Sequence, residues 1–280
     1  MRSEVHQHLE ETLGTPITRD HAVGGGCIHD ARRVDLADGR AVFVKSGAGT
    51  HGDLLVAEAR SLRLLSPHIR VPDVLGEGET ASGTRWLALE WLDMHPDGDR
   101  GRLGRATAGM HGVRADRHGL DHNNFIGATP QANGPMDDWS GFFIERRLKP
   151  QLELARRDGH SLPGIRIVEV AADLLANHHP APALLHGDLW SGNTSFLTDG
   201  TPVIFDPAAY FGDPETDLAM LELFGGRLGA DFFSGYGPEP EGRPIRRQLY
   251  DLYHALNHVH LFGAGYLGMV RRCLQGIGIR

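Results

Sequence analysis

The pattern of the first ninety residues restricts the fold most. From Val23 to Glu90 the chain consists of short runs rich in β-branched and aromatic residues, separated by Asp38-Gly39 and Ser82-Gly83. Runs at 33–36, 41–44 and 86–89 are typical of strands joined by turns, and together they predict an antiparallel sheet. Leucines between about Asp53 and Leu65 recur at helical spacing, which predicts one amphipathic helix packed against that sheet.

The pattern changes at about Gly101, where longer helical segments begin. Helices are predicted at 139–155, 165–176 and 246–260, with strands only near 183–185 and 202–205. A chain of 280 residues is long enough for one large domain or two lobes. We therefore expect an α+β protein with an N-terminal lobe at residues 1–91 and a mostly helical lobe at residues 92–280.

Charge and cysteine content exclude several classes of protein. The formal net charge of −8 does not favour binding to nucleic acid or to an anionic membrane surface. Two cysteines cannot form a disulfide framework, and the N-terminus is charged where a signal peptide would be apolar. We expect a cytoplasmic protein. The pairs His178-His179 and His258/His260 lack a third ligand at metal-site spacing, so no zinc site is expected.

The segment 184–193, Leu-Leu-His-Gly-Asp-Leu-Trp-Ser-Gly-Asn, and the later run 202–207 carry the clearest chemical pattern. Asp188 follows an apolar strand, Asn193 comes five residues later, and Asp206 ends a second apolar strand. One carboxylate can orient a hydroxyl nucleophile, while an amide and a second carboxylate supply oxygen ligands to Mg²⁺. This spacing predicts phosphoryl transfer.

The N-terminal half supplies groups suited to a nucleotide. Gly24, Gly25, Gly26 and Cys27 lie between predicted strands, where backbone amides can approach a triphosphate. Lys45 ends the apolar run 41–44, and Glu58 lies in the middle of the predicted helix, so the two can pair. The order of glycine loop, Lys, Glu, Asp188, Asn193 and Asp206 is the order of these parts in protein kinases.

The motif 186–193, the segment 119–127 (Gly-Leu-Asp-His-Asn-Asn-Phe-Ile-Gly) and 257–260 (Asn-His-Val-His) together make the resemblance specific. The chain resembles the fructosamine kinase (ketosamine 3-kinase) family, a relative of aminoglycoside and choline kinases, over almost its whole length. The resemblance implies a two-lobed, protein-kinase-like fold. It also implies transfer of phosphate from ATP, with Mg²⁺, to the 3-hydroxyl of a sugar that is joined to an amine, either small or protein-bound.

By that resemblance Asp188 is the catalytic base, and Asn193 and Asp206 are the magnesium ligands. Lys45 binds phosphate with Glu58 as its partner, and residues 90–92 (Glu90, Trp91 and Leu92) form the hinge whose backbone meets adenine. Asp217 is implied to brace the catalytic loop. Asp206 is followed by Pro207-Ala208 in place of Phe-Gly, and no activation-loop signature follows, so the sequence disfavours an ordinary protein-kinase substrate.

Several alternatives stay open at this point. Trp190 and His258 are candidates for acceptor binding, although either could simply pack in the lobe, and His186 is expected to hydrogen-bond within its loop. Cys27 either fills a turn or provides an oxidisable thiolate. The acceptor could instead be an aminoglycoside, choline or another amino-alcohol. A non-catalytic nucleotide-binding protein is disfavoured by the complete set of Lys45, Asp188, Asn193 and Asp206.

Overall fold

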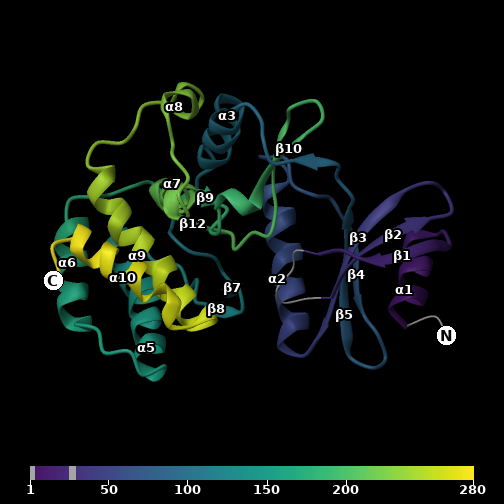
Figure 1. Cartoon of the computed structure of the whole chain (residues 1–280), viewed down its shortest axis with the longest axis horizontal. Helices are drawn as coiled ribbons and strands as arrows, with labels where there is room; N and C mark the ends of the chain where they lie inside the picture. Colours follow the sequence, from purple (N-terminus) through teal and green to yellow (C-terminus); the bar gives the residue numbers. More distant parts are fainter. Residues whose placement is uncertain (1–3, 25–29) are drawn as a thin grey trace. The chain divides into compact units, whose positions relative to one another are not determined.

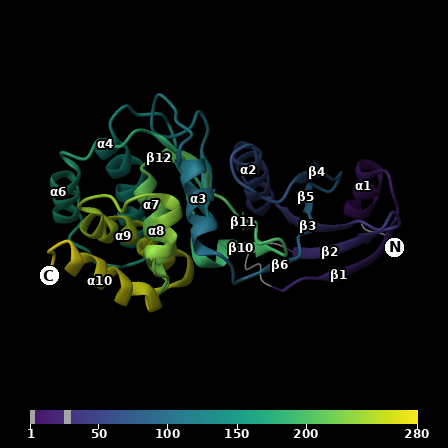
Figure 2. The same ribbon diagram turned by 90° about the horizontal axis from the view of Figure 1, so that it is seen from above.

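The computed structural model describes residues 4–24 and 30–280. The chain divides into one unit of residues 1–97 with 195–207, and a second of 98–194 with 208–280. Figures 1 and 2 together label their helices and strands. Gly25, Gly26 and Cys27 lie outside the described residues. The assignment of nucleotide binding to residues 1–91 and of catalysis to residues 92–280 stays a prediction.

The first unit contains a five-stranded antiparallel sheet in the order β1-β2-β3-β5-β4. The runs predicted to be strands lie within β2, β3 and β5, so the predicted antiparallel sheet is confirmed. The bounds are β1 (Ile17–Ala22), β2 (Asp30–Leu36), β3 (Ala41–Ala48), β4 (Val74–Glu79) and β5 (Thr84–Glu90).

Two helices cover this sheet, and strand alternation determines which residues each one meets (Figure 1). Val44 and Trp86 belong to a core shared with Leu9 of α1 (Glu4–Leu13). Lys45, the next residue along β3, points to the other face, where it meets Glu58 of α2 (Thr50–Leu65). The helix predicted from about Asp53 is confirmed, although it begins three residues earlier.

A small second sheet completes this unit, in the order β11-β10-β6. It consists of β6 (Met94–His95), β10 (Thr194–Leu197) and β11 (Pro202–Ile204). Ser195 donates through Oγ to the carbonyl of His95 at 2.7 Å, and Ile204 N donates to the carbonyl of Arg70 at 3.1 Å. These bonds bring the segment that leads into Asp206 to the same unit as Lys45.

The second unit is mostly helical, as predicted (Figures 1 and 2). Its core includes Trp139, Phe143, Leu185 and Leu256. Two short antiparallel pairs accompany the helices: β7 (Asn124–Ile126) with β8 (Thr129–Gln131), and β9 (Ala183–Leu185) with β12 (Tyr210–Gly212). The helices are α3 (Arg100–His111), α4 (Trp139–Phe143), α5 (Lys149–Arg157), α6 (Gly164–Leu175), α7 (Pro214–Leu223), α8 (Ala230–Tyr236), α9 (Arg243–Phe262) and α10 (Leu267–Gly276), with 3-10 turns at Ser191–Asn193 and Ala264–Tyr266.

The segment predicted as one helix at 139–155 is helical but not uniform. Asp138 caps its start by accepting a hydrogen bond from Gly141 N. A π-helical turn at Ile144–Leu148 separates α4 from α5. Pro150 lies just beyond that turn, and proline cannot donate the backbone hydrogen bond that a regular α-helix needs. The π-turn accommodates this break and carries the fully buried Arg147.

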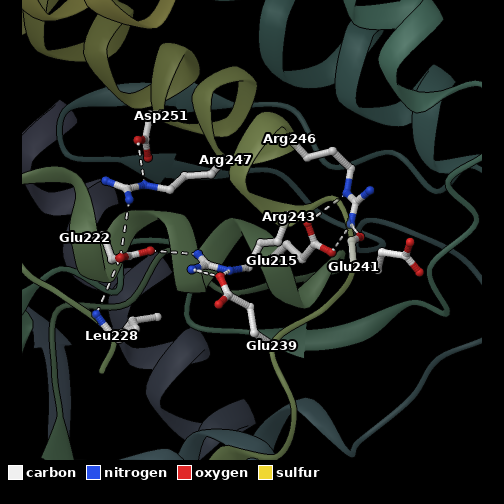
Figure 3. Close-up of polar contacts among 9 residues, drawn as sticks. All are labelled: Glu215, Glu222, Leu228, Glu239, Glu241, Arg243, Arg246, Arg247 and Asp251. Atoms are coloured by element: carbon white, nitrogen blue, oxygen red, sulfur yellow. Dashed lines mark hydrogen bonds and ion pairs between the residues drawn. The ribbon is translucent and has the colours of Figure 1, made fainter. Parts of the chain in front are cut away.

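Ion pairs join α7 to α9 (Figure 3). Glu222 accepts from Arg243 at 2.7 Å, and Arg246 binds both carboxylate oxygens of Glu215. Asp251 contacts Arg247 at 3.2 Å, but burial raises the pKa of Asp251 to about 7.

Among the residues that the structure describes, no helix is long and apolar enough to cross a membrane.

Candidate active site

Lys45 lies between two carboxylates of its own unit. Its Nζ donates to Glu58 Oε1 at 2.8 Å and Oε2 at 3.0 Å, and to Asp206 Oδ1 at 2.6 Å. Burial alone would lower the pKa of Lys45, but the charges of Asp206 and Glu58 outweigh it and raise that pKa. Burial also raises the pKa of Glu58, against the effect of Lys45. The predicted lysine–glutamate contact is therefore present, and the ammonium is held in place.

Asp206 has an unusual backbone conformation. Its φ of 57° is the only positive value at a non-glycine residue in the described part of the chain. Left-handed backbone costs most residues about 1 kcal/mol, and Asp tolerates it better than most. Strained residues of this kind cluster at functional sites. Here the strained turn directs a carboxylate, half exposed, at Lys45.

The second unit brings Asp188 and Asn193 together. Asn193 Nδ2 donates to the backbone carbonyl of Asp188 at 2.9 Å and approaches its Oδ2 at 3.4 Å. Because Asn193 uses its amide nitrogen here, its Oδ1 is the atom that could serve a cation. Asp188 N donates to Nδ1 of His186, a fully buried ring, so the predicted structural role of His186 is confirmed.

A buried carboxylate braces this loop. Asp217, on α7, accepts from His186 N at 2.8 Å and from Gly187 N at 2.9 Å, as predicted. Burial would raise the pKa of Asp217, but hydrogen bonds, with His111 first, hold it below its ordinary value. His111 on α3 lies 3.2 Å from Asp217, and Tyr236 on α8 contacts His111 at 2.9 Å. No sequence motif pointed to His111 or Tyr236, since their contacts span more than a hundred residues.

The remaining nucleotide-binding candidates are partly described. Gly24 lies in an exposed turn. The carboxylate of Glu90 is held by Arg70 Nη2 at 2.6 and 2.7 Å, while the Trp91 ring lies under the guanidinium of Arg33 at 4.5 Å. Leu92 is half-buried. The roles of all four in binding ATP stay predictions.

The structure connects the two candidates for acceptor binding. The rings of Trp190 and Phe224 lie 5.4 Å apart, and Phe224 lies 5.0 Å from His258. Phe224 was not predicted, because it follows α7 and has no motif around it. His258 Nδ1 donates to the carbonyl of His254 at 2.8 Å. Burial lowers the pKa of His258, so the ring is neutral near pH 7 and its Nε2 can accept a hydrogen bond.

Folding adds two carboxylates to one of the histidines considered in the sequence. His178, which has no third ligand at sequence spacing, is joined by Asp213 and Glu215, whose ligand atoms all lie within 4.8 Å of one another. Folding brings α7 to residue 178, which spacing could not reveal. These oxygens already serve other groups: Asp213 accepts from His178 at 2.6 Å and from Tyr250, and Glu215 accepts from Arg246. We therefore interpret the cluster as a structural network of hydrogen bonds and ion pairs.

Comparison with protein families gives a match over nearly the whole chain. Residues 1–278 match the family model described as fructosamine kinase. A Synechocystis protein assigned as a ketoamine kinase is 42% identical, covering 97% of this chain and 96% of its own. A protein-ribulosamine 3-kinase of Arabidopsis thaliana, described as chloroplastic, is 38% identical, covering 92% of this chain and 82% of its own.

Solved structures agree in fold. A crystal structure from Haemophilus somnus 129PT, assigned as a fructosamine-3-kinase, has a TM-score of 0.89 at 28% identity, covering 98% of this chain and 96% of that one. One from Thermobifida fusca with the same assignment has a TM-score of 0.87 at 34% identity and covers 99% of both chains. The aminoglycoside phosphotransferase APH(4)-Ia, at 16% identity, has a TM-score of 0.67 and covers 97% of this chain and 96% of its own, which shows a shared kinase-like fold.

Proposed function

The chain belongs to the fructosamine kinase family, and from that premise we propose that it transfers the γ-phosphate of ATP to a sugar hydroxyl of a ketoamine. The observation that carries this proposal is Lys45, held by Glu58 and Asp206 in one unit, together with the Asp188–Asn193 loop in the other. The relatives assigned as ketoamine and ribulosamine kinases support the acceptor class and its 3-hydroxyl.

In the proposed reaction the acceptor oxygen attacks the γ-phosphorus, the bond to the bridging oxygen of ADP breaks, and Asp188 accepts the hydroxyl proton. Asp188 suits this role because its backbone is fixed by His186 and Asn193 while its side chain is only half-buried. Lys45, which cannot lose its proton near pH 7, would bind phosphate oxygens as a fixed positive charge.

The residues also fit Mg²⁺. Hard divalent cations prefer oxygen ligands, and the Asp206 carboxylate and the Asn193 amide oxygen are of that kind. Magnesium, when bound, would neutralise charge on the transferred phosphate. Asp206 now contacts Lys45, so holding a cation requires its carboxylate to be shared between the two.

The acceptor would meet Trp190 and His258. An indole face attracts a cation or the apolar face of a sugar, and Nε2 of neutral His258 can accept from a hydroxyl or an ammonium group. The side chain of Trp190 packs over Gly192, where an added Cβ would lie 2.2 Å from the indole. A small or protein-bound ketoamine as the substrate, and a cytoplasmic location of the protein, stay predictions.

An acceptor screen tests the proposal. ATP consumption is measured with fructosyl-lysine, ribulosyl-lysine, kanamycin and choline, and we expect one of the two ketoamines to be phosphorylated fastest. Faster turnover of kanamycin or choline would instead support the aminoglycoside or choline alternative.

The Asp188→Asn variant tests the mechanism. We expect its turnover to fall by at least roughly a hundredfold with ATP binding retained, because the proton acceptor is removed. Asp137→Asn, at an exposed aspartate of the same unit, is the control and should keep its activity. Near-normal turnover in Asp188→Asn would contradict the assignment of the base.

A further inference from the structure

Three buried amide side chains lie on and beside the β7–β8 hairpin. Asn124, Gln131 and Asn133 are each no more than 3% exposed. Burying an amide is unfavourable unless its hydrogen bonds are satisfied, so the direction of those bonds shows what the amides hold.

The hydrogen bonds lead to the backbone just after Asp206. Asn124 Nδ2 donates to the carbonyl of Ala209 at 2.8 Å. Gln131 Nε2 donates to the carbonyl of Ala208 at 3.3 Å and to Asn124 Oδ1 at 2.8 Å. Two side-chain amides thus hold two consecutive peptide groups.

Neighbouring groups that can only donate, or only accept, a hydrogen bond determine how these amides are oriented. Arg147, which can only donate, gives a hydrogen bond from Nη2 to Asn133 Oδ1 at 2.7 Å. Asn133 must then present Nδ2 to Asn124 Oδ1, also at 2.7 Å, and this turns the Asn124 nitrogen toward Ala209. Linked hydrogen bonds of this kind polarise one another.

Gln131 is oriented by the groups that accept from it. Its Nε2 faces two acceptors, the Ala208 carbonyl and Asn124 Oδ1, so its Oε1 accepts from the Tyr253 hydroxyl on α9 at 2.7 Å. The guanidinium of Arg147 is itself fixed by the rings of Tyr210 and Phe142, at 4.1 and 4.8 Å. The amides are therefore locked in one orientation from both ends.

The peptide they hold touches the catalytic loop. Ala208 N donates to the carbonyl of His186 at 2.8 Å. The carbonyl oxygen of Ala208 faces Gly187, where an added Cβ would be only 2.2 Å away. Any movement of Ala208 is therefore transmitted to His186 and Gly187, which directly precede Asp188.

We propose that Asn124 and Gln131 are positioning residues for the loop that carries Asp188. They act through the backbone of Ala208 and Ala209. Arg147 sets the direction of the Asn133 and Asn124 amides, and Tyr253 satisfies the oxygen of Gln131. The inference rests on the proposed function, because Asp188 is the proposed base. It assigns a role in catalysis to buried residues whose side chains reach the loop only through the backbone of Ala208 and Ala209.

The test compares Gln131→Met, Tyr253→Phe and Tyr250→Phe in the full-length protein. Tyr250 is a matched control: it lies on the same helix, is buried, and donates to Asp213 instead of Gln131. Kinetics with ATP and fructosyl-lysine, urea unfolding, and amide hydrogen exchange of residues 183–193 are measured for each variant.

We expect Gln131→Met to lower kcat by roughly tenfold to a hundredfold, the scale for a misplaced catalytic group, with KM within about threefold of the parent. Tyr253→Phe should lower kcat several-fold, and both variants should exchange faster at residues 183–193. Tyr250→Phe should lose stability while keeping kcat and slow exchange.

Unchanged kcat in both Gln131→Met and Tyr253→Phe would overturn the proposal. It would also be overturned if Tyr250→Phe, at the same loss of stability, lowered kcat as much as these two variants do. If Gln131→Met does not fold, Tyr253→Phe decides the question alone. If the parent phosphorylates no acceptor, the proposed function fails, and hydrogen exchange still tests the positioning: faster exchange supports it and unchanged exchange refutes it.

Discussion

Replacing Gly187 by alanine tests how tightly the catalytic loop is fitted to the chain around it. Gly187 has φ of +80°, and a Cβ there would lie 2.2 Å from the Ala208 oxygen and 2.8 Å from its carbonyl carbon. Ordinary contact begins near 3.4 Å, so the loop or the Ala208 peptide must move by about 1 Å. A displacement of that size at a catalytic group can lower the rate about a hundredfold.

Gly159→Ala separates this steric effect from backbone strain. Gly159 has a similar φ of +86°, but an added Cβ meets nothing within 4 Å. Both variants should lose about 1 kcal/mol in free energy of unfolding from the left-handed backbone. Only Gly187→Ala should also lose about a hundredfold in kcat, measured as ADP formation with the acceptor that the screen selects. Equal kcat in the two variants, with both folded, would refute the reasoning.

Variants at two further residues test the strained carboxylate of Asp206 and the buried carboxylate of Asp251. Asp206→Ala should abolish activity and weaken magnesium-dependent ATP binding, measured by calorimetry; it should also be about 1 kcal/mol less stable than Asp206→Asn, because Asn tolerates φ of 57°. Magnesium-independent activity in the parent would contradict this. Burial raises the pKa of Asp251 to about 7, so the folded state keeps a proton that the unfolded chain has released above about pH 4. The stability that this proton confers is present at low pH and is lost as pH rises through 7. Asparagine does not titrate, so the free energy of unfolding of Asp251→Asn should rise by roughly 2–3 kcal/mol relative to that of the parent between pH 5 and pH 8. Urea unfolding at each pH measures this difference. A difference that does not change with pH would contradict it.

Local features of the active site could be predicted because the residues involved are close in sequence. Asp188 and Asn193 are five residues apart in one loop, so their hydrogen bond follows from a short 3-10 turn. The strand that carries Lys45 and the helix that carries Glu58 follow one another directly, and strand alternation with helical periodicity puts both side chains on facing surfaces.

Contacts between distant segments could not be predicted in the same way. Lys45 and Asp206 are 161 residues apart, and nothing in either motif specifies that the second carboxylate pairs with the lysine. His111 and Arg147 lie on helices whose patterns indicate only which face is buried, not which polar group that face meets.

The sequence by itself therefore determined the antiparallel sheet and helix of the first unit, the mostly helical second unit and the family, because these depend on local propensity and on residue types at short spacing. Only the tertiary structure decided that His111 supports Asp217 and that Gln131 reaches Ala208, 77 residues away. A hydrogen bond needs its two atoms placed within a few tenths of an ångström, and between distant segments only the packing of helices and strands provides that precision.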